Sequence, residues 1–160
     1  RNRRPRIRGR KNLWVKGEEE NNICIYNEPC DEFMKSHGLL FAASAKVNFG
    51  ETIVNLIVTD SHFSTLDEKT QLFFIYHEVG HIKHGHLNLS EKYGKLIILK
   101  RCLGFLPAIE VQADCYAASI IGKDAAKAVL RNLYKNKKLP FMSRFEAFKR
   151  SLRVKEIPLD

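Results

Sequence analysis

Two histidines and a glutamate lie close together in the middle of the chain, in the sequence His77-Glu78-Val79-Gly80-His81. Residues four apart face the same side of an α-helix, so both imidazoles could reach one metal ion. Imidazole is a common zinc ligand, and a glutamate beside the first histidine can take a proton from an attacking water molecule. This HExxH pattern predicts hydrolytic metal chemistry, with His77 and His81 as ligands and Glu78 as general base. The alternative is a helix that carries two histidines and a solvated glutamate.

A catalytic zinc ion usually has three protein ligands and one open position, so a third ligand is needed. The metzincin pattern would require a glycine at position 84 and a histidine at position 87, where this chain has His84 and Leu87. One straight helix also cannot easily supply three ligands to one tetrahedral ion. We therefore expect His84 and His86 to lie exposed at the end of the helix, where a cation complements the helix dipole.

Two acidic residues further along the chain are better candidates. Glu110 lies 29 residues after His81, and Asp114 follows it by four, so both face one side of a helix. Glu110 can be the third ligand, and Asp114 can accept a hydrogen bond from the free N–H of a ligand histidine. The alternative is an ordinary solvated acidic face. Apolar neighbours predict a largely buried helix, however, in which two carboxylates without a partner would be costly.

These two segments resemble a known family. HEVGH followed by EVQAD is similar to the gluzincin zinc metallopeptidases, whose pattern is HExxH followed by ExxxD on a second helix. The chain is most similar to the small ImmA/IrrE-like peptidases and to the soluble core of the HtpX-like peptidases, over about residues 31–122. The resemblance implies a zincin-like fold with one catalytic Zn²⁺ held by His77, His81 and Glu110. It also implies that Glu78 is the general base and that Asp114 contacts a ligand side chain and not the ion.

The group that stabilises the transition state cannot be placed by the resemblance. Tyr93, Tyr116, His62 and Arg144 all remain candidates, because geometry must decide such a role. A strand over residues 52–59 lies just before the metal-binding helix. We expect it to be a sheet edge that could bind an extended peptide substrate.

The elements around the motif follow from apolar spacing and turn residues. A β-rich front half and a helical back half predict an α+β fold. We expect strands at residues 22–26, 39–49 and 52–59, the last two as a β-hairpin, and helices at 31–37, 65–83, 90–104, 107–121, 124–135 and 143–152.

Capping residues mark the helix ends. Asp31 is expected to cap the first helix, and capping boxes are expected to begin at Thr65 and Ser143. Gly38 and Gly122 are expected to end helices, because glycine favours the left-handed conformation found there.

The charge of the chain is unevenly distributed. Residues 1–11 contain six Arg, one Lys and no acid, and so carry +7 of the total +9 among 160 residues. We expect a basic arm and connection over residues 1–22 and a single domain over 23–160. The arm could bind nucleic acid or an acidic protein surface, or remain a solvated tail. Its candidate contacts are Arg3, Arg4, Arg6, Arg8, Arg10 and Lys11.

Three functions remain open. The first is a zinc-dependent metalloendopeptidase that acts on a peptide or protein. The second is a metallopeptidase-fold structural or regulatory component of a large assembly, such as a virion, phage particle or ribonucleoprotein, anchored by the arm, in which zinc is structural or the site is inactive. The third is a DNA-associated regulator of the ImmA/IrrE type, which cleaves or displaces a repressor, although no helix-turn-helix is apparent in the sequence. Neither a signal peptide nor a run of about 20 apolar residues is visible, so we expect a cytoplasmic or assembly-bound protein with no membrane partner.

Overall fold

The computed structural model describes residues 13–14, 22–26, 28–88 and 107–159. The described residues form two compact units, one ending at Phe63 and the other beginning at Ser64. Among the described residues, the strands and one short helix lie in the first unit and the longer helices lie in the second, which confirms the expected α+β class. The basic arm, the helix expected over residues 90–104 and Tyr93 lie outside the described residues. The single domain expected over residues 23–160 stays a prediction.

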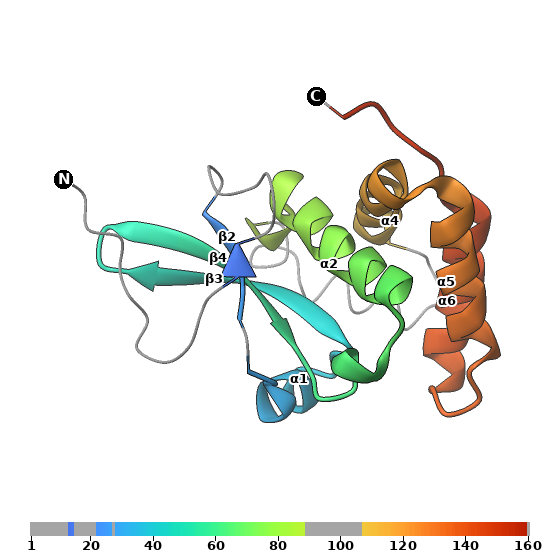
Figure 1. The fold of residues 1–160 in the computed structure, drawn as a ribbon, viewed down its shortest axis with the longest axis horizontal. Helices are drawn as coiled ribbons and strands as arrows, with labels where there is room; N and C mark the ends of the chain where they lie inside the picture. The colour runs from blue at the N-terminus through green and yellow to red at the C-terminus, as the bar shows by residue number, and fades with distance from the viewer. Residues whose placement is uncertain (1–12, 15–21, 27, 89–106, 160) are drawn as a thin grey trace. The chain divides into compact units, whose positions relative to one another are not determined.

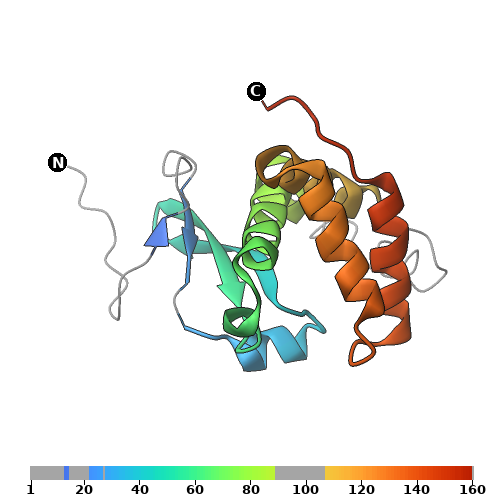
Figure 2. The ribbon, with the colours of Figure 1, turned by 45° about the vertical axis from the view of Figure 1, so that its right-hand side comes forward.

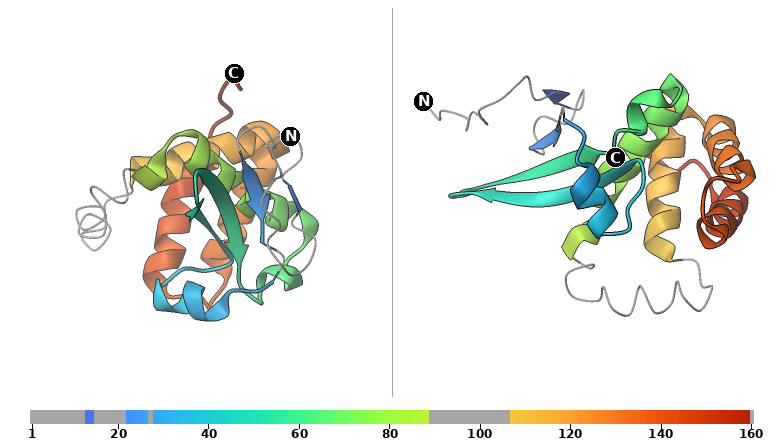
Figure 3. Two further views of the ribbon diagram at one scale, coloured as in Figure 1. Left: turned by 90° about the vertical axis from the view of Figure 1, so that its left-hand side faces the viewer. Right: turned by 90° about the horizontal axis from the view of Figure 1, so that it is seen from below.

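The first unit is built on a mixed sheet with the strand order β1-β2-β4-β3. Its strands are β1 (Leu13–Trp14), β2 (Ile23–Ile25), β3 (Ala42–Phe49) and β4 (Thr52–Thr59). Strands β3 and β4 pair antiparallel around the turn at Gly50, which confirms the predicted hairpin (Figure 3). Strand β2 pairs with the other side of β4 in parallel. The expectation that residues 52–59 form a sheet edge is therefore wrong, because β2 takes up the free side of that strand.

A short helix and one face of the sheet make the core of this unit. Helix α1 (Asp31–Ser36) ends before Gly38, whose φ of 63° is the left-handed conformation expected there. Asp31 is the first residue of the helix and not its cap, and its carboxylate instead accepts a hydrogen bond from the backbone N–H of Ser61 at 2.7 Å. The buried cluster of the unit comprises Cys24, Met34, Ala43, Val54, Leu56 and Val58.

Helix α2 (Glu68–Lys83) opens the second unit and carries the HExxH motif in its second half (Figure 1). Its N-cap is Asp67, whose carboxylate accepts hydrogen bonds from the backbone N–H and the hydroxyl of Thr70 at 3.1 and 2.6 Å. The capping box expected at Thr65 is wrong, because a short 3₁₀ turn over Phe63–Thr65 precedes the helix and a better acceptor follows it.

Three further helices complete the second unit. These are α4 (Ala108–Ile121), α5 (Lys123–Lys135) and α6 (Phe141–Arg153). Gly122, with a φ of 92°, ends α4 as expected. Helix α6 begins two residues before Ser143 and has Pro140 at its N-cap, so the capping box expected there is wrong. Helices α5 and α6 lie side by side, joined by a short connection (Figure 2).

Helices α2 and α4 pack closely, which brings the two halves of the sequence motif together. Gly80 of α2 lies against the backbone of α4, where an added Cβ atom would come within 3.0 Å of the Cα atom of Ala113. No helix among the described residues is long and apolar enough to cross a membrane.

Candidate metal centre

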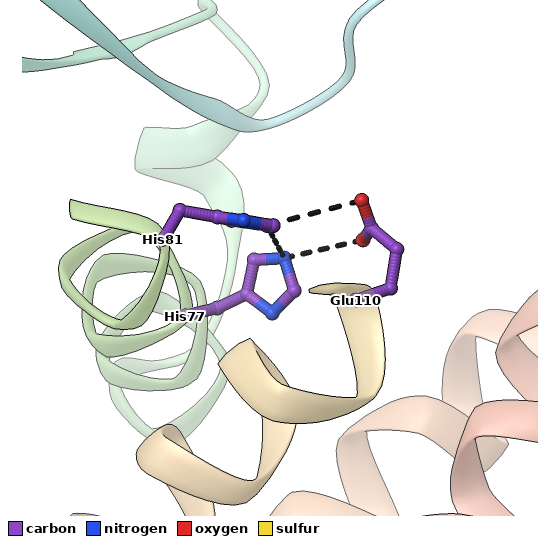
Figure 4. Close-up of side chains that lie close together, drawn as sticks. All are labelled: His77, His81 and Glu110. Atoms are coloured by element: carbon purple, nitrogen blue, oxygen red, sulfur yellow. Dashed lines mark hydrogen bonds and ion pairs between the residues drawn. The ribbon is translucent and has the colours of Figure 1, made fainter. Parts of the chain in front are cut away.

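Helices α2 and α4 place three candidate ligands at one point. His77 and His81 lie one turn apart on α2, and their Nε2 atoms are 3.1 Å apart. Glu110, in the first turn of α4, places its Oε2 atom 3.4 Å from His77 Nε2 and its Oε1 atom 3.8 Å from His81 Nε2. The three side chains point toward one another (Figure 4). They form a cluster that could hold a metal ion.

The spacing of these atoms fits a tetrahedral ion. Zinc with nitrogen and oxygen ligands at about 2.0–2.2 Å keeps neighbouring ligand atoms about 3.3–3.6 Å apart. The two histidine nitrogens, 3.1 Å apart, and the contacts of the two Glu110 oxygens, at 3.4 and 3.8 Å, lie close to that range. Two imidazole nitrogens and one carboxylate oxygen are also a donor set that zinc accepts, and they leave a fourth position for a water molecule or a substrate.

Glu78 follows the first ligand along α2, as the motif requires. Its carboxyl side chain is buried, with only 8% of the residue exposed. A solvated glutamate on an outer helix face, the alternative considered from the sequence, would be far more exposed. Burial near a candidate metal centre is the environment in which a carboxylate can act as a base.

Asp114 holds the first histidine in place. Its side chain is fully buried, and its Oδ1 atom lies 2.9 Å from Nδ1 of His77. A carboxylate can only accept, so the Nδ1–H group donates, and Nε2 of His77 is the atom that faces Glu110. The structure thus gives Asp114 the orienting position that its spacing from Glu110 predicts.

His86 holds the second histidine, which the sequence analysis did not foresee. His84 is exposed as expected, but His86 is buried, so its expected exposure is wrong. Its Nε2 atom lies 2.9 Å from Oε1 of Gln112, and its Nδ1 atom lies 2.9 Å from Nδ1 of His81. If Nε2–H donates to the amide oxygen, Nδ1 of His86 accepts from His81. The Nε2 lone pair of His81 is then left for the ion.

Arg150 of α6 is a second site residue whose role the sequence analysis missed. Its Nε and Nη2 atoms donate to the two oxygens of Asp114 at 2.7 and 2.6 Å, a bidentate pair. Its Nη1 atom lies 3.4 Å from the carboxylate of Glu110 and 3.8 Å from that of Glu146. One cation therefore faces both the third candidate ligand and the orienting carboxylate. No spacing rule links Arg150 to residues 36 and 40 positions earlier.

The charges of this cluster shift the pKa values of its members. Burial would lower the pKa of His77, but the hydrogen bonds to Asp114 and Glu110 outweigh it and raise this pKa to about 9. Burial and the positive charge on His77 lower the pKa of His81 to about 3. Without a metal ion, His77 is therefore the protonated histidine and His81 the neutral one.

The two carboxylates remain ionised in spite of their burial. Burial would raise the pKa of Glu110, but the hydrogen bond from His77 and the charge of Arg150 hold it well below its ordinary value. The pKa of Asp114 is lowered against its burial by the charge and hydrogen bonds of the same arginine. Glu110 is thus available as an anionic ligand at neutral pH.

Three described residues remain candidates for stabilising the transition state. Arg144 donates its Nε–H to the backbone carbonyl of Tyr134 at 2.8 Å and lies over that tyrosine ring. Tyr116 lies on α4, where its Cβ atom approaches Gly80 and its ring meets the edge of His84. His62 belongs to the first unit. Its candidacy stays a prediction.

Comparisons of the chain with protein-family models, with curated proteins and with solved structures found no match.

Proposed function

We propose that this chain is a zinc-dependent metalloendopeptidase. The observation that carries the proposal is the convergence of His77, His81 and Glu110, from two helices, at the spacing of a tetrahedral ion. The buried glutamate next to His77 adds the base that hydrolysis needs. A site that only stored or structurally used zinc would usually be closed by a fourth protein ligand. Among the described residues, the metal-binding cluster contains three.

The chemistry divides between the ion and the chain. Zinc, when bound, acts as a Lewis acid that polarises a carbonyl group and makes water a stronger nucleophile at neutral pH. Glu78 takes the proton of the attacking water and passes it to the amine that leaves. Asp114 and His86 keep one nitrogen of each ligand histidine directed at the ion. Arg150 keeps the carboxylates of Asp114 and Glu110 ionised and fixed.

Iron(II) is the principal competing metal, because two histidines and one carboxylate also form the facial triad of non-haem iron oxygenases. The HExxH spacing, with Glu78 between the ligands, favours zinc and hydrolysis. Elemental analysis of the purified chain distinguishes the metals. We expect about one zinc per chain, and stoichiometric iron instead would contradict the zinc assignment.

The substitution Glu78→Gln tests the peptidase assignment directly. It keeps the volume of the side chain but removes the base, so we expect zinc content to be retained and cleavage of casein or a peptide library to fall at least about 100-fold. Glu68→Gln, in the exposed first turn of the same helix, is the matched control and should cleave as the parent does. If the Glu78→Gln variant cleaves as well as the parent, the proposal is wrong.

The alternative function, an inactive component of a large assembly, makes a different prediction. A zinc-loaded parent chain would then cleave no peptide at any zinc concentration, and Glu78→Gln would change nothing. The buried glutamate at position 78 favours the enzyme, because an ion held only for structure has no need of a base beside it.

A further inference from the structure

Helix α6 presents an apolar stripe to solvent. Four large apolar side chains recur along one side of it, at Phe141, Phe145, Phe148 and Leu152, and they are 69%, 40%, 37% and 63% exposed. Met142, next to the stripe, is 51% exposed. A helix with its larger apolar residues outward reverses the usual arrangement, in which they face the core.

The inner side of the same helix carries small side chains and one arginine that is bonded to buried carboxylates. Ala147 and Ser151 are buried, and the hydroxyl of Ser151 donates to the carbonyl of Phe148 at 2.6 Å. Arg150 reaches the carboxylates of the metal centre from this side. Within the stripe, the Phe148 ring also packs against Tyr134 of α5, with the ring centroids 5.1 Å apart. Phe141 and Leu152, the most exposed members, are therefore the ones left for another role.

Basic residues flank the stripe on both sides. On a helix of about 3.6 residues per turn, Arg144 falls to one side of the stripe, and Lys149 and Arg153 fall to the other. The Lys149 ammonium lies over the Phe145 ring, 5.0 Å from its centroid. Arg153 and the following Lys155 are exposed.

The segment that contains α5 and α6 is positively charged as a whole, like the residues that flank the stripe. Residues 123–156, which contain α5 and α6, carry eleven Lys and Arg against three Asp and Glu, whereas residues 12–122 carry nine against fourteen. The small net charge outside the arm is thus the sum of an acidic part and a strongly basic part. The basic part is the one that carries the exposed stripe.

We propose that α6 docks this chain on an anionic lipid surface, with the stripe at the boundary between headgroups and acyl chains and the flanking cations against the headgroups. Helices that lie in this boundary combine exposed Phe and Leu with rows of Lys and Arg, as α6 does. A nucleic acid fits less well, because the exposed aliphatic side chains of Leu152 and Met142 cannot stack on bases as aromatic rings do. Surface docking needs no spanning segment.

Co-sedimentation of the full chain with lipid vesicles tests this proposal. We expect binding to phosphatidylcholine vesicles that contain about a third phosphatidylglycerol and much weaker binding to pure phosphatidylcholine. The pair Phe141→Ser and Leu152→Ser should weaken binding at least about tenfold, and so should the pair Arg153→Glu and Lys155→Glu. Both variants keep residues 1–11, so a loss cannot come from the basic arm.

Matched controls separate docking from non-specific attraction. Ile120→Ser removes an aliphatic residue of α4 that is 41% exposed, and Lys35→Glu with Lys69→Glu gives the same net charge as the α6 charge variant. Both controls should bind vesicles as the parent does, and zinc content should be unchanged throughout. The proposal is overturned if the parent ignores anionic vesicles or if the stripe variant binds like the parent. It is also overturned if the parent binds a single-stranded oligonucleotide more tightly than vesicles and the stripe variant loses that binding.

Discussion

Arg150 is the residue on which the buried charges of the metal centre depend most directly. Its guanidinium is bonded to both oxygens of Asp114, which is fully buried, and it lies close to Glu110. Arg150→Met would leave these carboxylates without their cation, and breaking a buried pair in this way typically costs about 3–5 kcal/mol. We expect a loss of unfolding free energy of that order, measured by urea denaturation of the metal-free chain.

Arg153→Met is the matched control for this change, because Arg153 lies in the same helix but is exposed. Its effect should stay within about 0.5 kcal/mol, the usual range for a surface substitution. Arg150→Lys should recover only part of the loss, since an ammonium cannot form the bidentate pair. Equal stabilities for the Arg150→Met and Arg153→Met variants would contradict the assigned role.

His86 makes a separate prediction about metal affinity. It contacts His81 at Nδ1, so His86→Ala should free that ring to rotate and weaken zinc binding. Groups that orient metal ligands typically contribute about 10- to 100-fold in affinity. Competition with a zinc chelator of known affinity measures the change.

The neighbouring His84 provides the control, because it lies two residues away and is exposed. His84→Ala should leave zinc affinity within about twofold of the parent. If the two alanine variants weaken binding equally, His86 does not hold His81. If His86→Ala abolishes binding altogether, His86 would instead be a ligand.

At the residue scale, the sequence indicated the part of the site that depends on local spacing. The i,i+4 pairs in HExxH and ExxxD are set by helix geometry alone, and the structure brings His77, His81 and Glu110 together. Arg150 and His86 could not be assigned in this way. The place of Arg150 depends on how α6 packs, and that of His86 on how the chain turns after Gly85, which has a φ of 67°.

At the scale of the elements, the site depends on how closely α2 and α4 approach. Gly80 permits this approach: a Cβ atom there would lie 3.0 Å from both Ala113 Cα and Tyr116 Cβ. Gly80→Ala gains about 1 kcal/mol of helix propensity but forces the helices apart, and overpacking costs about 1–3 kcal/mol. We expect a net loss near 1 kcal/mol in thermal or urea unfolding. Zinc affinity should also weaken, because Glu110 moves with α4.

Asn132→Ala is the control for Gly80→Ala, because Asn132 lies on the exposed side of α5. It measures the gain in helix propensity without a steric clash between helices. It should be neutral or slightly stabilising. A Gly80→Ala chain more stable than the parent, with unchanged zinc affinity, would show that α2 and α4 do not need this contact.

The ends of the elements were predictable where glycine sets them and unpredictable where several caps compete. Gly38 and Gly122 end their helices as expected, because their positive φ angles favour glycine. Helix α2 has Asp67 as its N-cap, and α6 has Pro140. An aspartate for α2 and a proline for α6, each close to the expected cap, took the N-cap position instead. The sequence pattern alone could not rank these competing N-cap residues. Likewise, the hairpin followed from alternation and its turn, but the parallel pairing of β2 with β4 is non-local.

At the scale of the whole molecule, stability should depend on pH in the metal-free chain and much less in the zinc-loaded chain. The pKa of His77 is raised from 6.5 to about 9 in the metal-free chain. A raised pKa contributes stability that is present below about pH 6.5 and is lost as the pH rises through 9. We therefore expect the metal-free chain to lose on the order of 3 kcal/mol across this interval. Urea unfolding in the presence of a chelator measures it.

Zinc should remove this dependence of stability on pH. The ion needs the Nε2 lone pair of His77, so it competes with a proton there, and its affinity should rise with pH over the same interval. The stabilisation that zinc confers, measured as the difference between the loaded and chelated chains, should grow accordingly. His77→Gln should remove both trends. A metal-free chain whose stability is flat between pH 6.5 and 9 would contradict the charge state assigned to His77.

The pairing of Arg150 with Asp114 also bears on the order in which the chain is made. All three candidate ligands have been synthesised once translation passes Gly122, but the cation that accompanies the buried carboxylate arrives only with α6. A nascent chain that stops before Phe141 would hold Asp114 without Arg150 to pair with it. A competent site would thus form only after α6 has been synthesised. Chains released early would carry the complete HExxH and ExxxD motifs and still lack a well-formed metal centre.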